Sequence, residues 1–128
     1  MPTPIADPTP ADVAQGQLDA YNARDIDTFM TFWDENAQIF EHPSTLLADG
    51  AAQIRARHLA RFQEPDLHGE LLGRVVVGNT VMDHERVRRN FGEGVGFLKV
   101  VGIYEIAGGR IRRAWFISGE KTLDAEVR

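Results

Sequence analysis

The sequence contains no cysteine. This absence excludes a disulfide-stabilised scaffold, a thiol nucleophile, a cysteine-ligated zinc or iron–sulfur site and a redox CxxC motif. Long hydrophobic runs are also missing, because the longest segment without Asp, Glu, Lys or Arg is Val75–Met82. A membrane-spanning helix needs ~20 apolar residues, so we predict no transmembrane helix and no membrane partner.

Positive charge is in the minority. Fourteen Lys and Arg against nineteen Asp and Glu give a formal net charge of -5, the opposite of the excess that attracts a polyanion. We therefore predict no nucleic-acid partner. Residues 1–6 have neither the basic residues nor the apolar segment of a secretory signal, which favours a cytoplasmic location.

The 128 residues, 43% of them hydrophobic, suit one globular domain that buries its own core. Prolines crowd the first ten residues, where they cannot support a helix or a strand. We predict a flexible leader over residues 1–8, a single domain over residues 9–121 and a tail over residues 122–128.

Hydrophobic periodicity predicts two helices near the start of the chain. The first begins at Thr9, with Asp12 at the spacing of a capping pair, and runs to about Asn22. The second follows Asp25 and carries a bulky apolar stripe that ends at Trp33.

A short strand is predicted over Ala37–Pro43, followed by a loop that reaches Gly50. The next segment, Ala51–Gln63, has the pattern of a third helix with its arginines largely on the outside. Those arginines are Arg55, Arg57 and Arg61.

β-Branched and aromatic residues between glycine turns predict four strands in the second half of the chain. They are Leu67–Val77, Thr80–Phe91, Val95–Ala107 and Arg110–Gly119. Three helices followed by four meandering strands is an α+β order rather than an alternating βαβ order.

Several of these segments resemble the nuclear transport factor 2-like superfamily, in its SnoaL-like and ketosteroid-isomerase-like branch. They are Tyr21–Asp27, Phe32–Trp33, Ala37–Pro43, Gly50–Ile54, Gly109–Ile111 and Gly119–Lys121. The resemblance implies a cone-shaped, curved, mostly antiparallel sheet packed on three N-terminal helices, a cystatin-like α+β roll around one apolar pocket. It also implies a homodimer formed through the sheet.

Ketosteroid isomerases have a Tyr on the first helix, an Asp-Pro pair at the end of the first strand and an Asp on a late strand. At the matching positions this chain has Gln17, His42 and Gly102. The resemblance therefore does not imply a standard 3-oxosteroid isomerase.

His42 is one candidate catalytic residue, since an imidazole with an ordinary pKa of ~6.5 exchanges protons at neutral pH. The alternative is a solvated histidine at the rim of the sheet. Alternation along the strand lets only one of Glu41 and His42 face inward, and the pattern leaves this choice open.

Asp83 and Glu85 are the other catalytic candidates. Alternation places both on one strand face with Val81, while His84 points to the opposite face. On a concave face they would be buried with raised pKa values, which suits a general acid or base. On an outer face they would form cross-strand ion pairs with arginines, and the family resemblance favours the inward orientation.

Six residues are expected to line the substrate pocket: Gln17, Tyr21, Trp33, Phe40, Tyr104 and Trp115. The alternative for Tyr104 and Trp115 is a place in the core or in a dimer interface. We expect His58, on an apolar helical face, to be a core histidine that hydrogen-bonds to the backbone. The four histidines lack metal-ligand spacing, and we predict neither metal nor cofactor.

The resemblance implies an enzyme that shuttles a proton on a small apolar carbonyl compound without a cofactor, as an isomerase or lyase. One alternative is a non-catalytic module that binds a hydrophobic ligand or a protein. Another is a dehydratase in which His42 acts together with Asp83 or Glu85, which requires them to lie within hydrogen-bonding distance.

Overall fold

The computed structural model describes residues 8–127, so the predicted leader lies outside the described residues except for Pro8. Its elements are α1 (Pro10–Ala23), α2 (Ile26–Thr31), β1 (Trp33–Glu41), β2 (Thr45–Asp49), α3 (Ala51–Arg61), β3 (His68–Val77), β4 (Thr80–Phe91), β5 (Gly94–Ala107), β6 (Arg110–Ser118), β7 (Thr122–Leu123) and a 3₁₀ turn, η1 (Asp124–Glu126).

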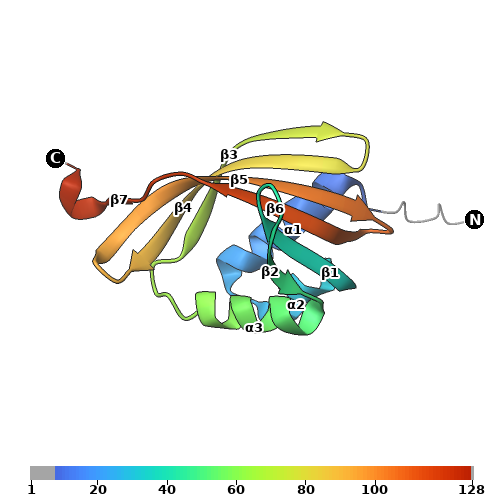
Figure 1. The fold of residues 1–128 in the computed structure, drawn as a ribbon, viewed down its shortest axis with the longest axis horizontal. Coiled ribbons are helices and arrows are strands. Elements are labelled where there is room, and N and C mark those ends of the chain that lie inside the picture. Colours follow the sequence, from blue (N-terminus) through green and yellow to red (C-terminus); the bar gives the residue numbers. More distant parts are fainter. Residues whose placement is uncertain (1–7, 128) are drawn as a thin grey trace, which may run out of the picture.

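The strands form one open, curved, mostly antiparallel sheet with the three helices on one side of it (Figure 1). Its order is β2-β1-β6-β5-β4-β3, and β7 pairs with β5. All pairs are antiparallel except β1 with β6. The predicted α+β class and the curved sheet on three helices are confirmed.

The start of α1 follows the predicted capping pair. The Asp12 backbone N–H donates to Thr9 Oγ1 at 3.1 Å, and the Thr9 N–H donates to Asp12 Oδ2 at 3.0 Å. These reciprocal bonds satisfy N–H groups that an uncapped helix leaves without partners.

The second helix is shorter than predicted, because α2 ends at Thr31 and Trp33 already belongs to β1. Trp33 aligns with Ile111 of β6, and the Ile111 N–H donates to the Phe32 carbonyl at 2.7 Å. Pairing with a strand almost eighty positions later therefore overrides the local helical pattern. The predicted loop before Gly50 also contains an edge strand, β2.

The four predicted strands of the second half are confirmed as β3 to β6. Beyond them β7 packs against β5 at Gly96, where a Cβ atom would lie 2.3 Å from the Thr122 carbonyl oxygen. Only glycine admits so close an approach. Asp124 then forms an ion pair with Arg88 of β4.

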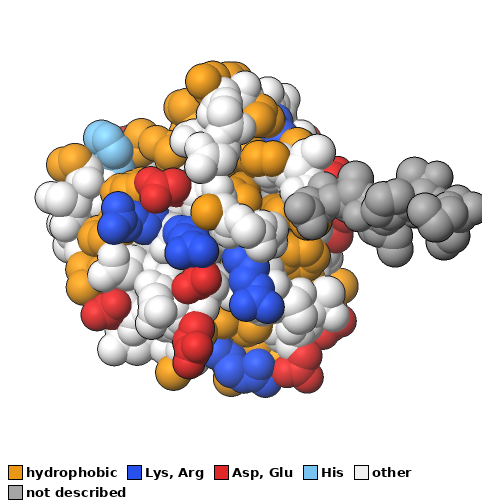
Figure 2. Space-filling model, turned by 90° about the vertical axis from the view of Figure 1, so that its right-hand side faces the viewer, with side chains coloured by type: hydrophobic (Ala, Val, Ile, Leu, Met, Phe, Trp, Pro, Cys, Tyr) orange, Lys and Arg blue, Asp and Glu red, His pale blue; other side chains and the backbone are white. Residues whose placement is uncertain are grey.

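Figure 2 shows Lys and Arg side chains interspersed with Asp and Glu on one face of the molecule, with no continuous area of either sign. Among residues 8–127, every helix is too short or too polar to cross a membrane.

Where the helices meet the concave face of the sheet, the side chains are packed away from solvent. The largest fully buried ones are Phe29, Ile39, Ile54, Ile111, Val13, Val81 and Asp83. All of these side chains except Asp83 are hydrocarbon. Asp83 lies on β4, beside the candidate functional site.

Candidate functional site

Strand β4 presents an alternating row to the concave side of the sheet. Its inward residues Val81, Asp83, Glu85 and Val87 are buried, while the residues between them are exposed. Asp83 is 0% exposed and Glu85 is 6% exposed. The predicted inward orientation of the two carboxyl groups is therefore confirmed.

A cavity of about 370 Å³ lies between this face and helices α1 and α3, at the small end of the range of ligand pockets. The helices contribute Gln17, Leu18, Tyr21, Arg57, His58 and Arg61 to its wall. Among the strand residues in the wall are Trp33, Ile39, Glu41, Glu85, Arg89, Tyr104 and Phe116.

Glu85 is the acidic group deepest in this wall. Burial, together with the charge of the nearby Asp83, raises its pKa to about 7, while the charge of Arg74 opposes the rise. Among residues 8–127, no side chain forms an ion pair with its carboxylate. A carboxyl group of this kind takes up and releases a proton at neutral pH.

Asp83, two residues before Glu85 on β4, is fully buried and is not part of the cavity wall. Arg74 of β3 binds it with two bonds, Nε to Oδ1 at 2.6 Å and Nη2 to Oδ2 at 3.0 Å. Arg74 also donates to Gln15 Oε1 at 3.1 Å. A cross-strand ion pair of the kind considered from the sequence thus exists, but it lies on the inner face and joins Asp83 to Arg74 rather than to Arg88, Arg89 or Arg112.

Tyr104 of β5 is buried beside this carboxyl pair. Its hydroxyl oxygen accepts a bond from Gln17 Nε2 at 3.4 Å, which leaves the phenolic proton free to be donated. Burial, with the charges of Glu85 and Asp83, raises the pKa of Tyr104 well above its usual value. A Cβ at Gly102 would lie 2.9 Å from the Tyr104 hydroxyl, so glycine at this position makes room for the phenol.

His58 is the core histidine predicted from the sequence, and it also lines the cavity. Its Nδ1 lies 2.8 Å from the Ile54 carbonyl oxygen, which can only accept, so Nδ1 carries the proton and Nε2 is an acceptor. Burial lowers the pKa of His58 to about 4, so the ring is neutral at pH 7. The sequence predicted only that His58 lies on the apolar face of its helix, and nothing in the local pattern indicated a cavity beside it.

Glu41, rather than His42, faces the cavity from the end of β1. His42 is exposed just beyond the strand, where its backbone N–H donates to the Phe116 carbonyl at 2.9 Å. The dehydratase hypothesis required a hydrogen bond between His42 and Asp83 or Glu85. Among residues 8–127, His42 forms no such bond.

Four of the six expected pocket residues, Gln17, Tyr21, Trp33 and Tyr104, line the cavity, and two do not. Phe40 and Trp115 are aligned on the neighbouring strands β1 and β6. Their rings stack with centroids 5.8 Å apart and an interplanar angle of 15°. Both follow the strand face opposite to the buried Ile39 and Ala114.

Three arginines in the cavity wall were not foreseen as site residues. Arg57 and Arg61 of α3 were expected outside, and Arg89 ends the inward row of β4. Arg57 is exposed, as its polar helix face predicts, and Arg61 is half-buried. Only the packing of α3 against the sheet places both beside the cavity mouth.

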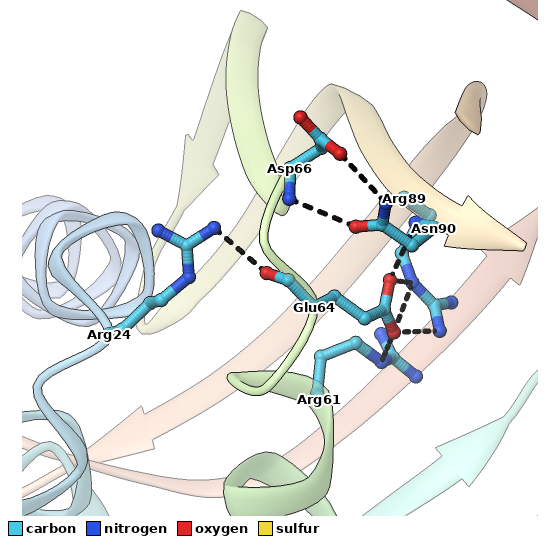
Figure 3. A network of polar contacts seen from close by, with 6 residues as sticks. All are labelled: Arg24, Arg61, Glu64, Asp66, Arg89 and Asn90. Atoms are coloured by element: carbon cyan, nitrogen blue, oxygen red, sulfur yellow. Dashed lines mark hydrogen bonds and ion pairs between the residues drawn. The ribbon is translucent and has the colours of Figure 1, made fainter.

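Arg61 and Arg89 join a network at the end of α3 (Figure 3). Glu64 accepts three bonds from Arg89, the shortest from Nη2 at 2.7 Å, and its Oε2 lies 3.8 Å from Arg61 Nε. Arg24 Nη2 donates to the Glu64 carbonyl at 2.9 Å. Within residues 8–127, no group of three His, Asp or Glu side chains is placed to hold a metal ion.

Comparison with solved structures agrees with this architecture. An uncharacterised cystatin-fold protein from Novosphingobium aromaticivorans has a TM-score of 0.80 at 26% identity, over 85% of this chain and 97% of that one. A SnoaL-like polyketide cyclase from Agrobacterium tumefaciens has a TM-score of 0.73 at 21% identity, over 88% and 92%. An NTF2-like protein of unknown function from Cytophaga hutchinsonii has a TM-score of 0.71 at 17% identity, over 93% and 95%.

Among curated proteins, no significant match to the sequence was found. The sequence does match a family, described as the SnoaL-like domain, over residues 14–114. This match covers most of the chain and includes most of α1, all of α3, and the strands β4 and β5 that carry Glu85 and Tyr104. The protein therefore belongs to the SnoaL-like domain family of the nuclear transport factor 2-like superfamily.

Proposed function

We propose that this protein is a cofactor-independent enzyme that moves a proton on an apolar carbonyl compound, with Glu85 as the general base. The observation that carries the proposal is a buried carboxyl group, without an ion-pair partner among the described residues, whose pKa of about 7 places it midway between its two protonation states at neutral pH. A general base in this position contributes ~10²–10⁴-fold to a rate.

In the proposed reaction, Glu85 removes a proton from the carbon next to the carbonyl group, and the electron pair moves to the carbonyl oxygen as an enolate. The Tyr104 hydroxyl donates a hydrogen bond to that oxygen, as its bond from Gln17 allows. Glu85 then returns the proton to the same or another carbon, which gives exchange or isomerisation. Asp83 acts as a positioning residue, because its charge helps to keep the pKa of Glu85 high.

The polyketide cyclase among the structural neighbours supports a small-molecule substrate for this fold. The cavity wall also supports it, because aliphatic and aromatic side chains, among them Leu18, Trp33 and Val100, line it together with its polar and charged groups. His42 has no step in this mechanism, since it lies outside the cavity wall.

The test is proton exchange on a simple ketone, 1-phenylhexan-1-one, dissolved in D₂O with the protein and followed by proton NMR. We expect the protein to accelerate loss of the signal next to the carbonyl group, and Glu85→Gln to remove roughly 10²–10⁴-fold of that acceleration. His84→Gln, on the exposed face of the same strand, is the matched control and should exchange like the wild type.

The binding-module alternative predicts a different outcome. A protein that only captures the ketone would gain thermal stability from it but would not accelerate exchange. Equal acceleration by the wild type and Glu85→Gln would also contradict the proposal.

We also infer a homodimer formed through the outer face of the sheet. Apolar side chains from adjacent strands meet there in register, with Ile103 opposite both Met82 and Trp115. Met82 is 42% exposed and Ile117 is 44% exposed. Exposed apolar groups that adjoin across three strands are typical of an interface.

A further inference from the structure

The mouth of the cavity carries a cluster of positive charge, formed by Arg57, Arg61 and Arg89. Arg57 and Arg61 are one turn apart on α3, and Arg89 reaches the same wall from the end of β4. This cluster takes no part in the proton transfer proposed above.

Arg61 and Arg89 already share a partner, because both approach the carboxylate of Glu64. Arg57 forms no ion pair with any Asp or Glu among residues 8–127. Burial and the charges of Arg61 and Arg89 both lower the pKa of Arg57. The guanidinium of Arg57 therefore stands in a positive field without an acidic partner in the described chain.

The side-chain charges at the cavity mouth do not sum to zero. The other acidic groups are Glu41, in the cavity wall, and Glu64, bonded to the arginines. Three guanidinium groups thus face two carboxylates at the mouth, so one positive charge is left over there, while Glu85 lies deeper, four residues before Arg89 on β4. A ligand group with a single negative charge neutralises this uncompensated positive charge, whereas a phosphate dianion carries one negative charge too many.

We propose that the ligand of this cavity carries one carboxylate, which Arg57 binds at the mouth with support from Arg61 and Arg89, while its apolar body extends toward Glu85. Guanidinium groups pair with carboxylates through two parallel hydrogen bonds. Glu85 and Arg89 are four residues apart on one strand, a Cα separation of roughly 13 Å, so an elongated ligand spans the two groups. Which end of the ligand reacts rests on the proposed function, whereas the carboxylate site does not.

The test compares two ligands that differ only in charge, 6-oxo-6-phenylhexanoate and its methyl ester, by isothermal titration calorimetry. We expect the acid to bind roughly tenfold more tightly than the ester, as for a hydrogen-bonded charge pair. Arg57→Gln should remove most of this preference. Arg113→Gln changes an exposed arginine outside the cavity wall and should keep it.

Raising the salt concentration should reduce the preference for the acid in the wild type, since an ion pair at the mouth is partly screened. Equal affinity for acid and ester would overturn the proposal, and so would a preference that survives Arg57→Gln. Failure of the acid to bind at millimolar concentration would overturn it too.

Two measurements on Glu85→Gln, the acid and ester titrations and the NMR exchange assay, separate this proposal from the proposed function. If the acid preference is kept while Glu85→Gln still exchanges protons, the carboxylate site stands and the general base is wrong. If exchange is lost in Glu85→Gln but acid and ester bind equally, the general base stands and the carboxylate site is wrong.

Discussion

Two buried ionisable side chains face the same cavity, and burial pushes their pKa values in opposite directions. Glu85 moves from 4.5 to about 7, and His58 moves from 6.5 to about 4. The cause is the same, because a low-dielectric surrounding disfavours the charged form of either group. At pH 7 His58 is therefore neutral, whereas Glu85 is divided between its neutral and ionised forms.

These shifts have opposite effects on the free energy of unfolding. Folded Glu85 holds its proton up to about pH 7 whereas the unfolded chain releases it near 4.5, so its contribution is present at low pH and is lost as pH rises. Folded His58 resists protonation down to about pH 4, so its contribution is present above 6.5 and is lost as pH falls. Each shift corresponds to ~3 kcal/mol.

We predict that the two slopes largely cancel in the wild type between pH 4.5 and 6.5. In Glu85→Gln the His58 effect remains alone, so stability should rise with pH across this window. In His58→Asn the Glu85 effect remains alone, so stability should fall with rising pH. Urea unfolding at the two ends of the window measures both slopes, and parallel profiles for all three proteins would contradict the prediction.

At the scale of elements, the junction between α3 and β3 depends on Glu64 more than on the local chain. Glu64 binds Arg89 and the Asn90 N–H of β4 through its carboxylate, while its carbonyl accepts from Arg24 after α1 (Figure 3). One residue thus connects a helix end, a neighbouring loop and a strand.

We predict that Glu64→Ala lowers the free energy of unfolding by roughly 1–3 kcal/mol, since it removes hydrogen bonds to a partly buried charged group. Asp27→Ala removes an exposed ion pair with Arg55 and should change it by less than about 1 kcal/mol. Urea unfolding at neutral pH compares the two variants. Equal losses would show that the junction does not depend on Glu64.

At the scale of the whole molecule, the curved sheet separates two apolar environments. Its concave face holds the core and the cavity, and its outer face carries the apolar residues inferred to join two copies. An acidic residue in that outer patch has to be desolvated beside hydrocarbon, which disfavours association.

We predict that the wild type sediments as a dimer in analytical ultracentrifugation and that Ile117→Glu sediments as a monomer with an unchanged circular dichroism spectrum. Leu59→Glu, at a position 41% exposed on α3 and so on the helix side of the sheet, is the control and should remain dimeric. A monomeric wild type at the highest attainable concentration would contradict the inferred interface.

Local patterns predicted much of this fold because they depend on neighbouring residues. The capping pair of Thr9 and Asp12 and the four strands of the second half follow from spacing and turn residues alone. The end of α2 could not be predicted in this way, because Trp33 pairs with Ile111 of β6. That partner is far away in the sequence and does not affect the local pattern.

The sequence by itself determined which residues alternate on β4, and hence that Asp83 and Glu85 share one face, since side-chain direction has a period of two along a strand. Only the tertiary structure decided how that face is used. In the folded chain Arg74 forms an ion pair with Asp83, whereas Glu85 lines a cavity without such a partner among the described residues. Arg57 lines the same cavity at its mouth. These outcomes depend on how distant elements pack, which sets the desolvation and the charge partners of each group.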